Sequence, residues 1–512
     1  MTTTNQLKAQ FPRNLLLQII SFCTQVSVGL YLVPYLVHNL GPAAFGLIPI
    51  AGMLTQYVSL ISQSLSSAVN RYLTIAIQRN DFKDASAIFS TAFFSCLVIG
   101  LVQIPFFSAC IYYADLFIDI PEDILTDAFL LLIFSAATFI MNLLTGIFSV
   151  PLYALNRIDL IRIVDILRSI SRFIGILIIF YFFTPSLRYV GYVYFVISVF
   201  LCILTRYISY KLSPQIFIKL SCFQRNKVKS LVGMSSWLLI NQIGTLLFLQ
   251  MDVWVCNRFV GAVEAGKYAA VLQWSTLIRQ GGAIVGAVAS PMIMIYFAKK
   301  DIYSIVKLSL LSLKALSLFL VIPISIICYF SSSLLELWLG VNYAKLSILM
   351  IVMVSHLVIN VGVLPLFSIQ VALEKVKLPA MLTLIMGIIN LLLAIFFAKY
   401  LDLGIFGVAT ATALVLTTKN AIFTPIYVAK ILNKPWFIFF EAFLPSLVLA
   451  SAILLLCYII NFVLPVHLSW MHLFFVSILI GAIGSLLAWF LLSKQDRKTI
   501  RSLPQLQKNR VK

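Results

Sequence analysis

Charged residues are scarce in this sequence, and acidic residues are the scarcest of them. Only 11% of the 512 residues are Asp, Glu, Lys or Arg, whereas a soluble chain carries about 25%. Asp and Glu number 17 against 37 Lys and Arg, while 62% of the chain is hydrophobic and the mean hydropathy is +1.04. This balance excludes an ordinary soluble domain and indicates membrane spans of about 20 residues each.

Motifs for nucleotide, metal and disulfide chemistry are also missing. There is no GxxxxGK[ST] loop, so the chain carries no ATP motor of its own. The eight cysteines form no CxxC pair and the four histidines have no metal-ligand spacing. His356 alone lies in the middle of a span, where a hydrogen-bonded packing role is favoured over a proton relay. We expect no metal, no cofactor and no enzyme domain, because every predicted loop is short.

The apolar runs predict an all-α polytopic membrane protein with about fourteen transmembrane helices. The order of these helices predicts two six-helix lobes, 1–215 and 216–434, two additional helices in 435–493, and a basic tail in 494–512. The predicted spans are 14–37, 45–70, 86–113, 125–150, 160–183, 189–210, 230–256, 268–297, 305–330, 346–371, 378–399, 405–429, 437–461 and 470–493.

The two lobes repeat each other at an offset of about 220 residues. The segment 41–46, GPAAFG, recurs as 261–266, GAVEAG, and Asp81 recurs as Asp301. The segment 154–157, ALNR, recurs as 372–375, ALEK, and Gly191 corresponds to Gly407. A duplicated helical membrane protein is typical of a transporter that binds its cargo between the repeats.

The positive charges are distributed unevenly between the two sides of the predicted spans. Of the 37 Lys and Arg, 27 fall on segments of one side and five on the other. The positive-inside rule therefore places both termini in the cytoplasm. These cations, including those of the tail, are expected to meet anionic membrane lipids rather than nucleic acid.

Five cations fall inside the predicted spans and away from their ends. They are Arg168, Arg172, Arg279, Lys314 and Lys419. Each costs about 2.5–3.5 kcal/mol at the centre of a span, so such residues mark a functional site by default. Arg279 lies about 16 Å deep, which is near the midplane. The alternatives are a structural pairing for Arg279 and snorkelling of the others toward the interface.

Two buried carboxylates are candidates for ion coupling. Asp165 shares one helix face with Arg162, Arg168 and Arg172, and it can pair with either of the first two. If that span begins nearer 166, Asp165 instead lies at the interface. Asp252 either couples an ion or pairs with Arg258.

Neutral polar residues form stripes along several spans. Gln25 belongs to a stripe on the first span, and Gln63 belongs to one on the second that ends at Arg71. Hydrogen bonding between helices would explain such stripes, but their recurrence favours the wall of a polar cavity. A cavity with many cations and few acids predicts an anionic cargo, and a pyrophosphate matches the forked donors of arginine.

Several segments resemble the polysaccharide flippases. These are Pro34 with 36–46, LVHNLGPAAFG; 70–72, NRY; 155–157, LNR; and 250–252, QMD, with 266–268, GKY. The resemblance covers essentially the whole chain and implies the O-antigen and capsule branch of the multidrug/oligosaccharidyl-lipid/polysaccharide exporter superfamily. That family carries no invariant catalytic motif, and only Arg279 falls where related lipid flippases place cavity arginines.

The resemblance implies a flippase of the bacterial cytoplasmic membrane, which moves undecaprenyl-pyrophosphate-linked oligosaccharide by alternating access. A proton or sodium gradient would bias the cycle, and a polysaccharide polymerase and assembly proteins would be partners. The alternatives are a multidrug exporter or a peptidoglycan lipid-precursor flippase of the same architecture. A membrane polymerase or ligase would need a large outer loop, and a scaffold would leave the buried arginines unexplained.

Overall fold

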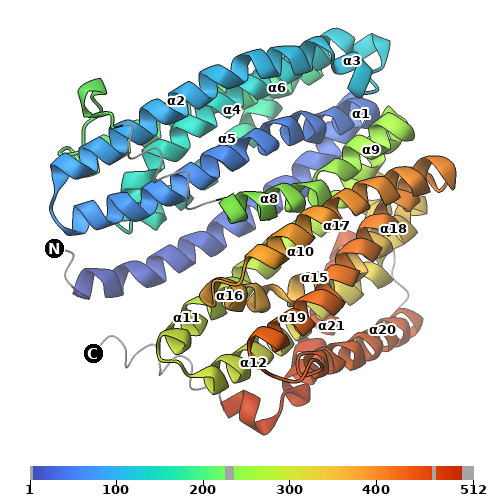
Figure 1. Cartoon of the computed structure of the whole chain (residues 1–512). Coiled ribbons are helices and arrows are strands. Elements are labelled where there is room, and N and C mark those ends of the chain that lie inside the picture. Colours follow the sequence, from blue (N-terminus) through green and yellow to red (C-terminus); the bar gives the residue numbers. More distant parts are fainter. Residues whose placement is uncertain (1–3, 225–235, 464–468, 499–512) are drawn as a thin grey trace. The chain divides into compact units, whose positions relative to one another are not determined.

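The computed structural model describes residues 4–224, 236–463 and 469–498 (Figure 1). Over these residues the chain is helical and contains no strand, which confirms the predicted fold class. Eleven of the described helices are long and apolar enough to cross a membrane. The predicted spans 160–183 and 230–256 lie on helices outside that set, and the predicted span 45–70 lies on α1, which contributes the single candidate Leu16–Met53. The count of fourteen therefore stays a prediction.

The chain divides into two compact units, 1–266 and 267–512. Unit 1 contains α1 (Thr4–Gln78), α2 (Phe82–Tyr112), α3 (Ala114–Phe117), α4 (Leu125–Ala154), α5 (Ile158–Phe182), α6 (Leu187–Leu212), α8 (Ser236–Leu249) and α9 (Met251–Phe259). Helices α4, α5 and α6 pack on one another and on α1, and buried apolar residues of α1, α2 and α4 form a shared core. Helices α8 and α9 also pack on α1, so unit 1 extends past residue 215. The predicted boundary between the two repeated lobes at 215 stays a prediction.

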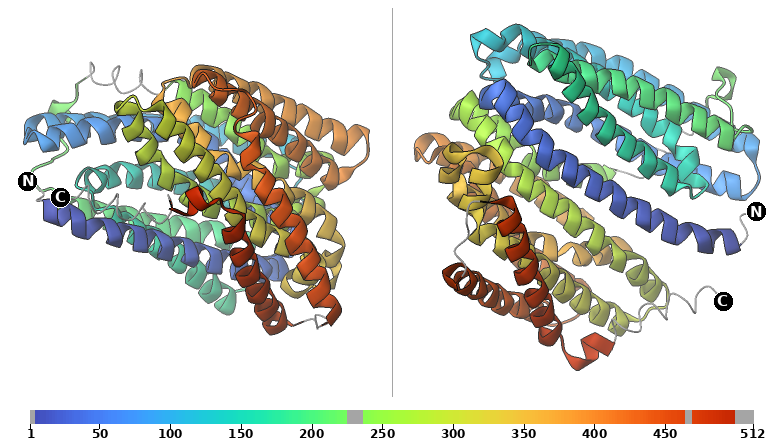
Figure 2. Two further views of the ribbon diagram at one scale, coloured as in Figure 1. Left: turned by 90° about the horizontal axis from the view of Figure 1, so that it is seen from below. Right: turned by 180° about the vertical axis from the view of Figure 1, so that it is seen from behind.

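Unit 2 begins within α10 (Ala262–Gly286). It continues through α11 (Ser290–Ala298), α12 (Ile302–Tyr329), α13 (Ser331–Leu339), α14 (Ser347–Ser355), α15 (Leu357–Gly362), α16 (Leu364–Ala372), α17 (Lys377–Ile395), α18 (Gly404–Thr417), α19 (Thr424–Ile431), α20 (Leu444–Val463) and α21 (Trp470–Leu491). Its core joins α11, α12, α16 and α19. The two additional helices, α20 and α21, pack on α12 (Figure 2).

Local backbone structure recurs at the repeat offset. Asp81 caps α2 by accepting a hydrogen bond from the backbone N–H of Asp84 at 2.9 Å, and Asp301 caps α12 in the same way from Ser304 at 3.0 Å. The residues just before these caps, Asn80 and Lys300, share the unusual φ of 57°. The pair at 156 and 374 likewise has φ of 59° and 57°. The repeat therefore preserves turn geometry even where the side chains differ.

The repeated glycine motif brings its two copies into contact within unit 1. Gly41 breaks α1 into two helices with φ 79° and ψ 160°, a conformation that favours glycine. Gly266 packs against the first copy so closely that a Cβ atom there would lie 1.7 Å from the carbonyl oxygen of Pro42. A Cβ at Gly46 would lie 2.8 Å from the backbone nitrogen of Gly266. The motif is therefore a packing device that requires small residues.

Candidate functional site

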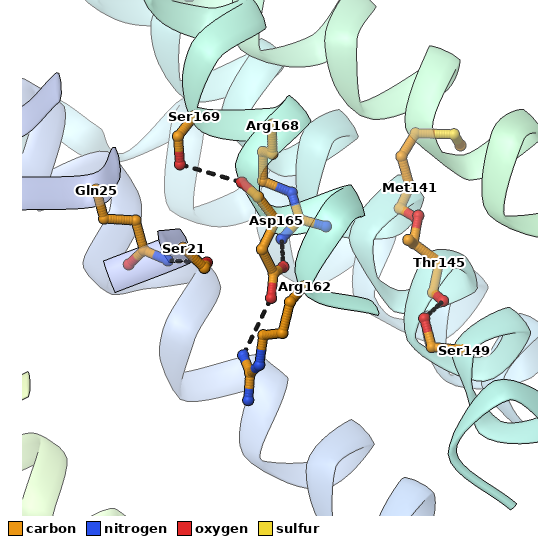
Figure 3. Close-up of polar contacts among 9 residues, drawn as sticks. All are labelled: Ser21, Gln25, Met141, Thr145, Ser149, Arg162, Asp165, Arg168 and Ser169. Carbon is orange, nitrogen blue, oxygen red and sulfur yellow. Dashed lines mark hydrogen bonds and ion pairs between the residues drawn. The ribbon is translucent and has the colours of Figure 1, made fainter. Parts of the chain in front are cut away.

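The charged face predicted on α5 is present and its ion pairs are formed (Figure 3). One oxygen of Asp165 accepts from Arg162 Nη1 at 3.1 Å, and the other accepts from Arg168 Nη1 at 3.0 Å. Ser169 Oγ donates to the backbone carbonyl of Asp165 at 3.1 Å. Asp165 therefore pairs with Arg162 and Arg168 at the same time, and two guanidinium groups hold this carboxylate. Its role in ion coupling stays a prediction.

Arg172, one turn further along α5, has no carboxylate partner in the part of the chain that the structure describes. Its guanidinium carbon lies 4.3 Å from the ring centroid of Tyr194 on α6, which is a cation–π contact. The Nε atom of Arg172 is buried and has no hydrogen-bond acceptor among the described residues. This half-buried cation keeps an unused N–H donor, as the prediction of an anion-binding role requires.

Gln25 lies on α1 beside the charges of α5 (Figure 3). Its Nε2 donates to Ser21 Oγ at 3.2 Å. The same stripe begins with Asn14, whose Oδ1 accepts from the backbone nitrogen of Asp159 at 2.9 Å, and Arg13 pairs with that aspartate at 3.1 Å. The first residue of the stripe therefore joins α1 to α5 by a hydrogen bond, as expected if the stripe serves packing between helices and not the wall of a cavity.

The polar stripe on the second predicted span lies partly outside the described residues. The side chains of Gln63 and Arg71, which the sequence assigns to substrate binding, lie outside the described residues. Gln56, in the same predicted stripe, is exposed. The assignment of these two residues to substrate binding stays a prediction.

Asp252 is buried at the first turn of α9, with 4% of its surface exposed. Its neighbour Asn257 exchanges hydrogen bonds of 2.7 and 2.9 Å with the backbone of Asp119, and the Asp119 carboxylate accepts from the backbone nitrogen of Ala262 at 3.0 Å. Asp119, in the segment between α3 and α4, thus holds α9 and the start of α10 in place. The predicted coupling role of Asp252 stays a prediction.

Several of the described spans of unit 2 depart from regular α-helix, and three of them do so between two α-helical segments. The span of α10 and α11 is interrupted by a 3-10 turn, Ala287–Ala289. The span of α14, α15 and α16 is interrupted at His356 and at Val363. The span of α18 and α19 contains a π-helical turn, Thr418–Phe423. Broken helices and π turns expose backbone groups and recur at binding sites in membrane proteins.

Polar side chains connect these interruptions. Arg279 on α10 donates from Nε to Ser275 Oγ at 3.3 Å, and it lies near the ring of His356. His356 Nδ1 lies 2.7 Å from Asn360 Nδ2, which donates to Thr417 Oγ1 at 3.0 Å. The Oδ1 atom of Asn360 is buried and accepts no hydrogen bond from the described residues. The hydrogen bond confirms the expected packing interaction of His356.

Lys419 lies in the π turn, two residues after Thr417. Only 7% of its surface is exposed, and its ammonium lies 5.3 Å from the ring centroid of Phe367 on α16. No carboxylate among the described residues pairs with it. Burying an unpaired ammonium is costly, so its presence here supports a role in binding. We define Arg279, His356, Asn360, Thr417 and Lys419 as the unit 2 polar cluster.

Lys314 does not join the unit 2 polar cluster. Its ammonium forms an ion pair with Asp496 at 2.9 Å, beyond the end of α21. Sequence reasoning missed this partner, and it also missed Asn360, Thr417 and Tyr194. The spacing of His356 and Asn360, four residues apart on one helix face, was the available signal for the amide.

Comparison with solved structures defines the class of protein first. The fold is that of the multidrug/oligosaccharidyl-lipid/polysaccharide exporter superfamily. The structure titled lipid II flippase MurJ, inward closed conformation, is 15% identical, with a TM-score of 0.68 over 92% of this chain and 98% of that chain. An inward-facing multidrug resistance transporter of the MATE family is 13% identical, with a TM-score of 0.65 over 80% of this chain and 94% of that one.

Family membership follows from the sequence comparisons. Residues 13–297 match the family described as polysaccharide biosynthesis protein, and the chain belongs to that family. It is 27% identical to "Uncharacterized membrane protein EpsK" of Bacillus subtilis over 96% of this chain and 97% of that protein. It is 25% identical to "Putative O-antigen transporter" of Shigella flexneri over 68% and 81%. The protein is therefore a multi-pass membrane protein of the polysaccharide biosynthesis family, and it shares its fold with the two transporters just described.

Proposed function

We propose that this protein is a flippase for undecaprenyl-pyrophosphate-linked oligosaccharide, the repeat unit of an O-antigen, capsule or exopolysaccharide. The observation that carries the proposal is the unit 2 polar cluster, in which the buried Lys419 and the partly buried Arg279 lie on interrupted helices. Such a group suits a pyrophosphate, because buried cations interact strongly with an anion that arrives dehydrated.

The roles within the cluster follow from donor chemistry. Arg279 offers forked N–H donors to a phosphate, while Lys419 supplies a compact positive charge. Asn360 retains a buried carbonyl oxygen, which accepts from a sugar hydroxyl. Arg172 and Arg168, on α5, are proposed as further anion contacts in unit 1. The polyprenyl chain remains in lipid, because burying it in a polar cluster would forfeit its solvation by hydrocarbon.

Transport proceeds in this proposal by alternating access of the two predicted six-helix lobes. Asp165 or Asp252 would bind a proton or sodium ion that biases the cycle. The protein resides in the bacterial cytoplasmic membrane with both termini in the cytoplasm, and a polysaccharide polymerase and assembly proteins take up the product. Support for these points comes from the charge asymmetry and from family membership.

The decisive experiment replaces Arg279 by Ala in a strain that lacks the chromosomal copy. We expect loss of surface polymer and build-up of a complete lipid-linked repeat unit, measured by mass spectrometry of extracted lipids. Arg79→Ala is the matched control, because Arg79 is exposed at the end of α1. Normal polymer in the Arg279→Ala strain, with the protein present in the membrane, would overturn the site assignment.

A peptidoglycan lipid precursor is the second cargo that the fold supports, since the chain shares its fold with a lipid II flippase. That precursor has the same polyprenyl-pyrophosphate chemistry, so the unit 2 polar cluster alone does not separate the two. The same lipid extracts do. Build-up of lipid II without loss of surface polymer would select the peptidoglycan precursor, whereas drug sensitivity without lipid build-up would select a multidrug exporter.

A further inference from the structure

A cavity of about 500 Å³ lies at the end of unit 2 where α12 begins and α21 ends. Its volume falls within the range of about 300–1,000 Å³ that is usual for small-molecule sites. It is separate from the unit 2 polar cluster, because none of the cluster residues lines it. Tyr303, at its rim, is 72% exposed, so the cavity reaches the protein surface.

The cavity is rich in lysine. Lys307 and Lys314 lie two turns apart on the same face of α12, and Lys434 contributes from the segment after α19. Glu441 and Asp496 are the acidic residues among those that line it. The lining therefore carries one more positive than negative charge, with Asp496 already engaged by Lys314 at 2.9 Å.

The carboxylate of Asp496 lies in the cavity where the anionic group of a ligand would bind. Its carboxylate accepts from Lys314 Nζ at 2.9 Å and from the backbone nitrogen of Ser493 at 3.1 Å, while Ser493 Oγ accepts from the backbone nitrogen of Asp496. Burial works to raise the pKa of Asp496, but the hydrogen bonds from Lys314 and Ser493 lower it below its ordinary value. A carboxylate held between an ammonium and a backbone N–H shows that this place suits an anionic oxygen group.

The cavity also has an apolar side. Val306 and Leu311 of α12 and Ala442 of the adjoining turn line it and are almost fully buried. Lys314 lies about 18 Å along α12 from Ile302, and side chains of a helix tilt toward its N-terminus. Its ammonium therefore points toward the interface at which α12 begins. Lysine side chains next to an apolar wall suit a membrane lipid, because the phosphate of a lipid lies directly above its acyl chains.

We propose that this cavity binds the anionic phosphate headgroup of a membrane lipid, with Lys307, Lys314 and Lys434 contacting the phosphate in place of Asp496. The inference goes beyond the proposed transport function, because it concerns headgroup binding and is measured without transport. Free phosphate shares the same chemistry, and the apolar wall favours the lipid as its source.

The test measures binding of phosphatidylglycerol and of phosphatidylcholine to the purified full-length protein, by native mass spectrometry in detergent. We expect phosphatidylglycerol to bind selectively. Each lysine near a lipid surface contributes about 1 kcal/mol, so Lys307→Gln and Lys434→Gln should each weaken binding about fivefold. Lys345→Gln is the matched control, because Lys345 is exposed and follows the other end of α12.

Two further arms sharpen the result. Asp496→Asn should strengthen phosphatidylglycerol binding, because the internal competitor for Lys314 is lost. Inorganic phosphate at millimolar concentration should not displace the lipid, and displacement would identify free phosphate as the ligand and overturn the lipid assignment. Equal binding of the two lipids, or variants of Lys307 and Lys434 that match Lys345→Gln, would overturn the proposal as a whole.

Discussion

The two units place charge in the membrane in different ways. In unit 1, Arg162 and Arg168 lie on a regular helix and share one carboxylate, Asp165. In unit 2, Lys419 is almost completely buried on a π turn and no described carboxylate pairs with it. Paired charges at half-buried positions lose little free energy on desolvation and change stability only slightly. An unpaired buried charge lowers the stability of the folded protein. Arg172 of unit 1 also lacks a described carboxylate partner, but it is less buried than Lys419, so the comparison supports our proposal that the functional charge lies mainly in unit 2.

What the two repeats share is backbone geometry rather than charge. Asp81 and Asp301 cap equivalent helices, and the residues before them share a φ of 57°. The buried lysine of unit 2 has no such counterpart among the features that recur. Duplication therefore preserved the turns that fold each repeat, while the charges diverged.

The largest loss of stability should come from a substitution at the contact between the two copies of the repeated glycine motif. Gly266→Ala places a Cβ atom 1.7 Å from the carbonyl oxygen of Pro42, and backbone cannot move aside as a side chain can. We expect a loss of more than about 3 kcal/mol, enough to remove most folded protein from the membrane. Detergent-extracted protein that elutes as a single species in size-exclusion chromatography measures the folded yield.

Gly52→Ala is the matched control for that experiment. A Cβ atom at Gly52 has no neighbour within 4 Å, and the position lies on the same long helix as Pro42. Alanine there should leave the yield unchanged or raise it slightly, because alanine favours helix. Equal yields for the two variants would show that the contact between the motif copies does not constrain the fold.

The second prediction separates function from stability at Lys419. Lys419→Met keeps a similar length but removes the buried charge, so the variant should fold as well as the wild type or better. Transport should nevertheless fall at least about tenfold, because the lost interaction with a dehydrated phosphate is worth more than about 1.4 kcal/mol. Surface polymer and membrane abundance, measured in the same cells, give the two readouts.

Lys430→Met is the control for Lys419, since Lys430 is exposed on the next helical segment of the same span. It should leave both polymer and abundance near wild type. If Lys419→Met instead lowers abundance and leaves transport per molecule intact, the lysine is structural and the contrast between the units disappears.

Part of this contrast between the units can be predicted from the sequence, and part of it cannot. The face shared by Arg162, Asp165 and Arg168 follows from helical periodicity alone. The ion pair of Lys314 does not, because its partner is 182 residues away and only packing of α12 beside α21 brings them together. The π turn at Lys419 was also missed, although Pro425, two residues after the turn ends, was an available marker of an irregular helix.

The third prediction concerns the compensated charges of unit 1. Asp165→Asn leaves Arg162 and Arg168 without their carboxylate, yet these side chains are 34% and 28% exposed and remain partly solvated. We expect a loss of about 1 kcal/mol, smaller than for a fully buried pair. Thermal unfolding of the purified variant measures it, with Asp115→Asn at an exposed position as control. A loss of transport without loss of stability would instead move the functional charge into unit 1.

The smallest effect should come from the repeated caps, and it depends on pH. Hydrogen bonds from Ser304 lower the pKa of Asp301 below its ordinary value of about 3.9. A lowered pKa in the folded state means that the charged cap stabilises fully above the ordinary value and loses this contribution as pH falls through the folded pKa. Asp301→Asn retains the acceptor oxygen without the charge, so it should lower the unfolding temperature slightly at pH 7, and the difference from wild type should shrink as the pH falls through the folded pKa.

Asp81→Asn makes the matching change in unit 1, because Asp81 caps α2 through the same backbone bond. If the caps are equivalent devices inherited by both repeats, the two variants should lose similar stability at pH 7, each less than Asp165→Asn. A marked loss in only one of them would mean that the shared cap geometry no longer carries shared energetics. The divergence between the units would then extend from their buried charges to the turns that start their helices.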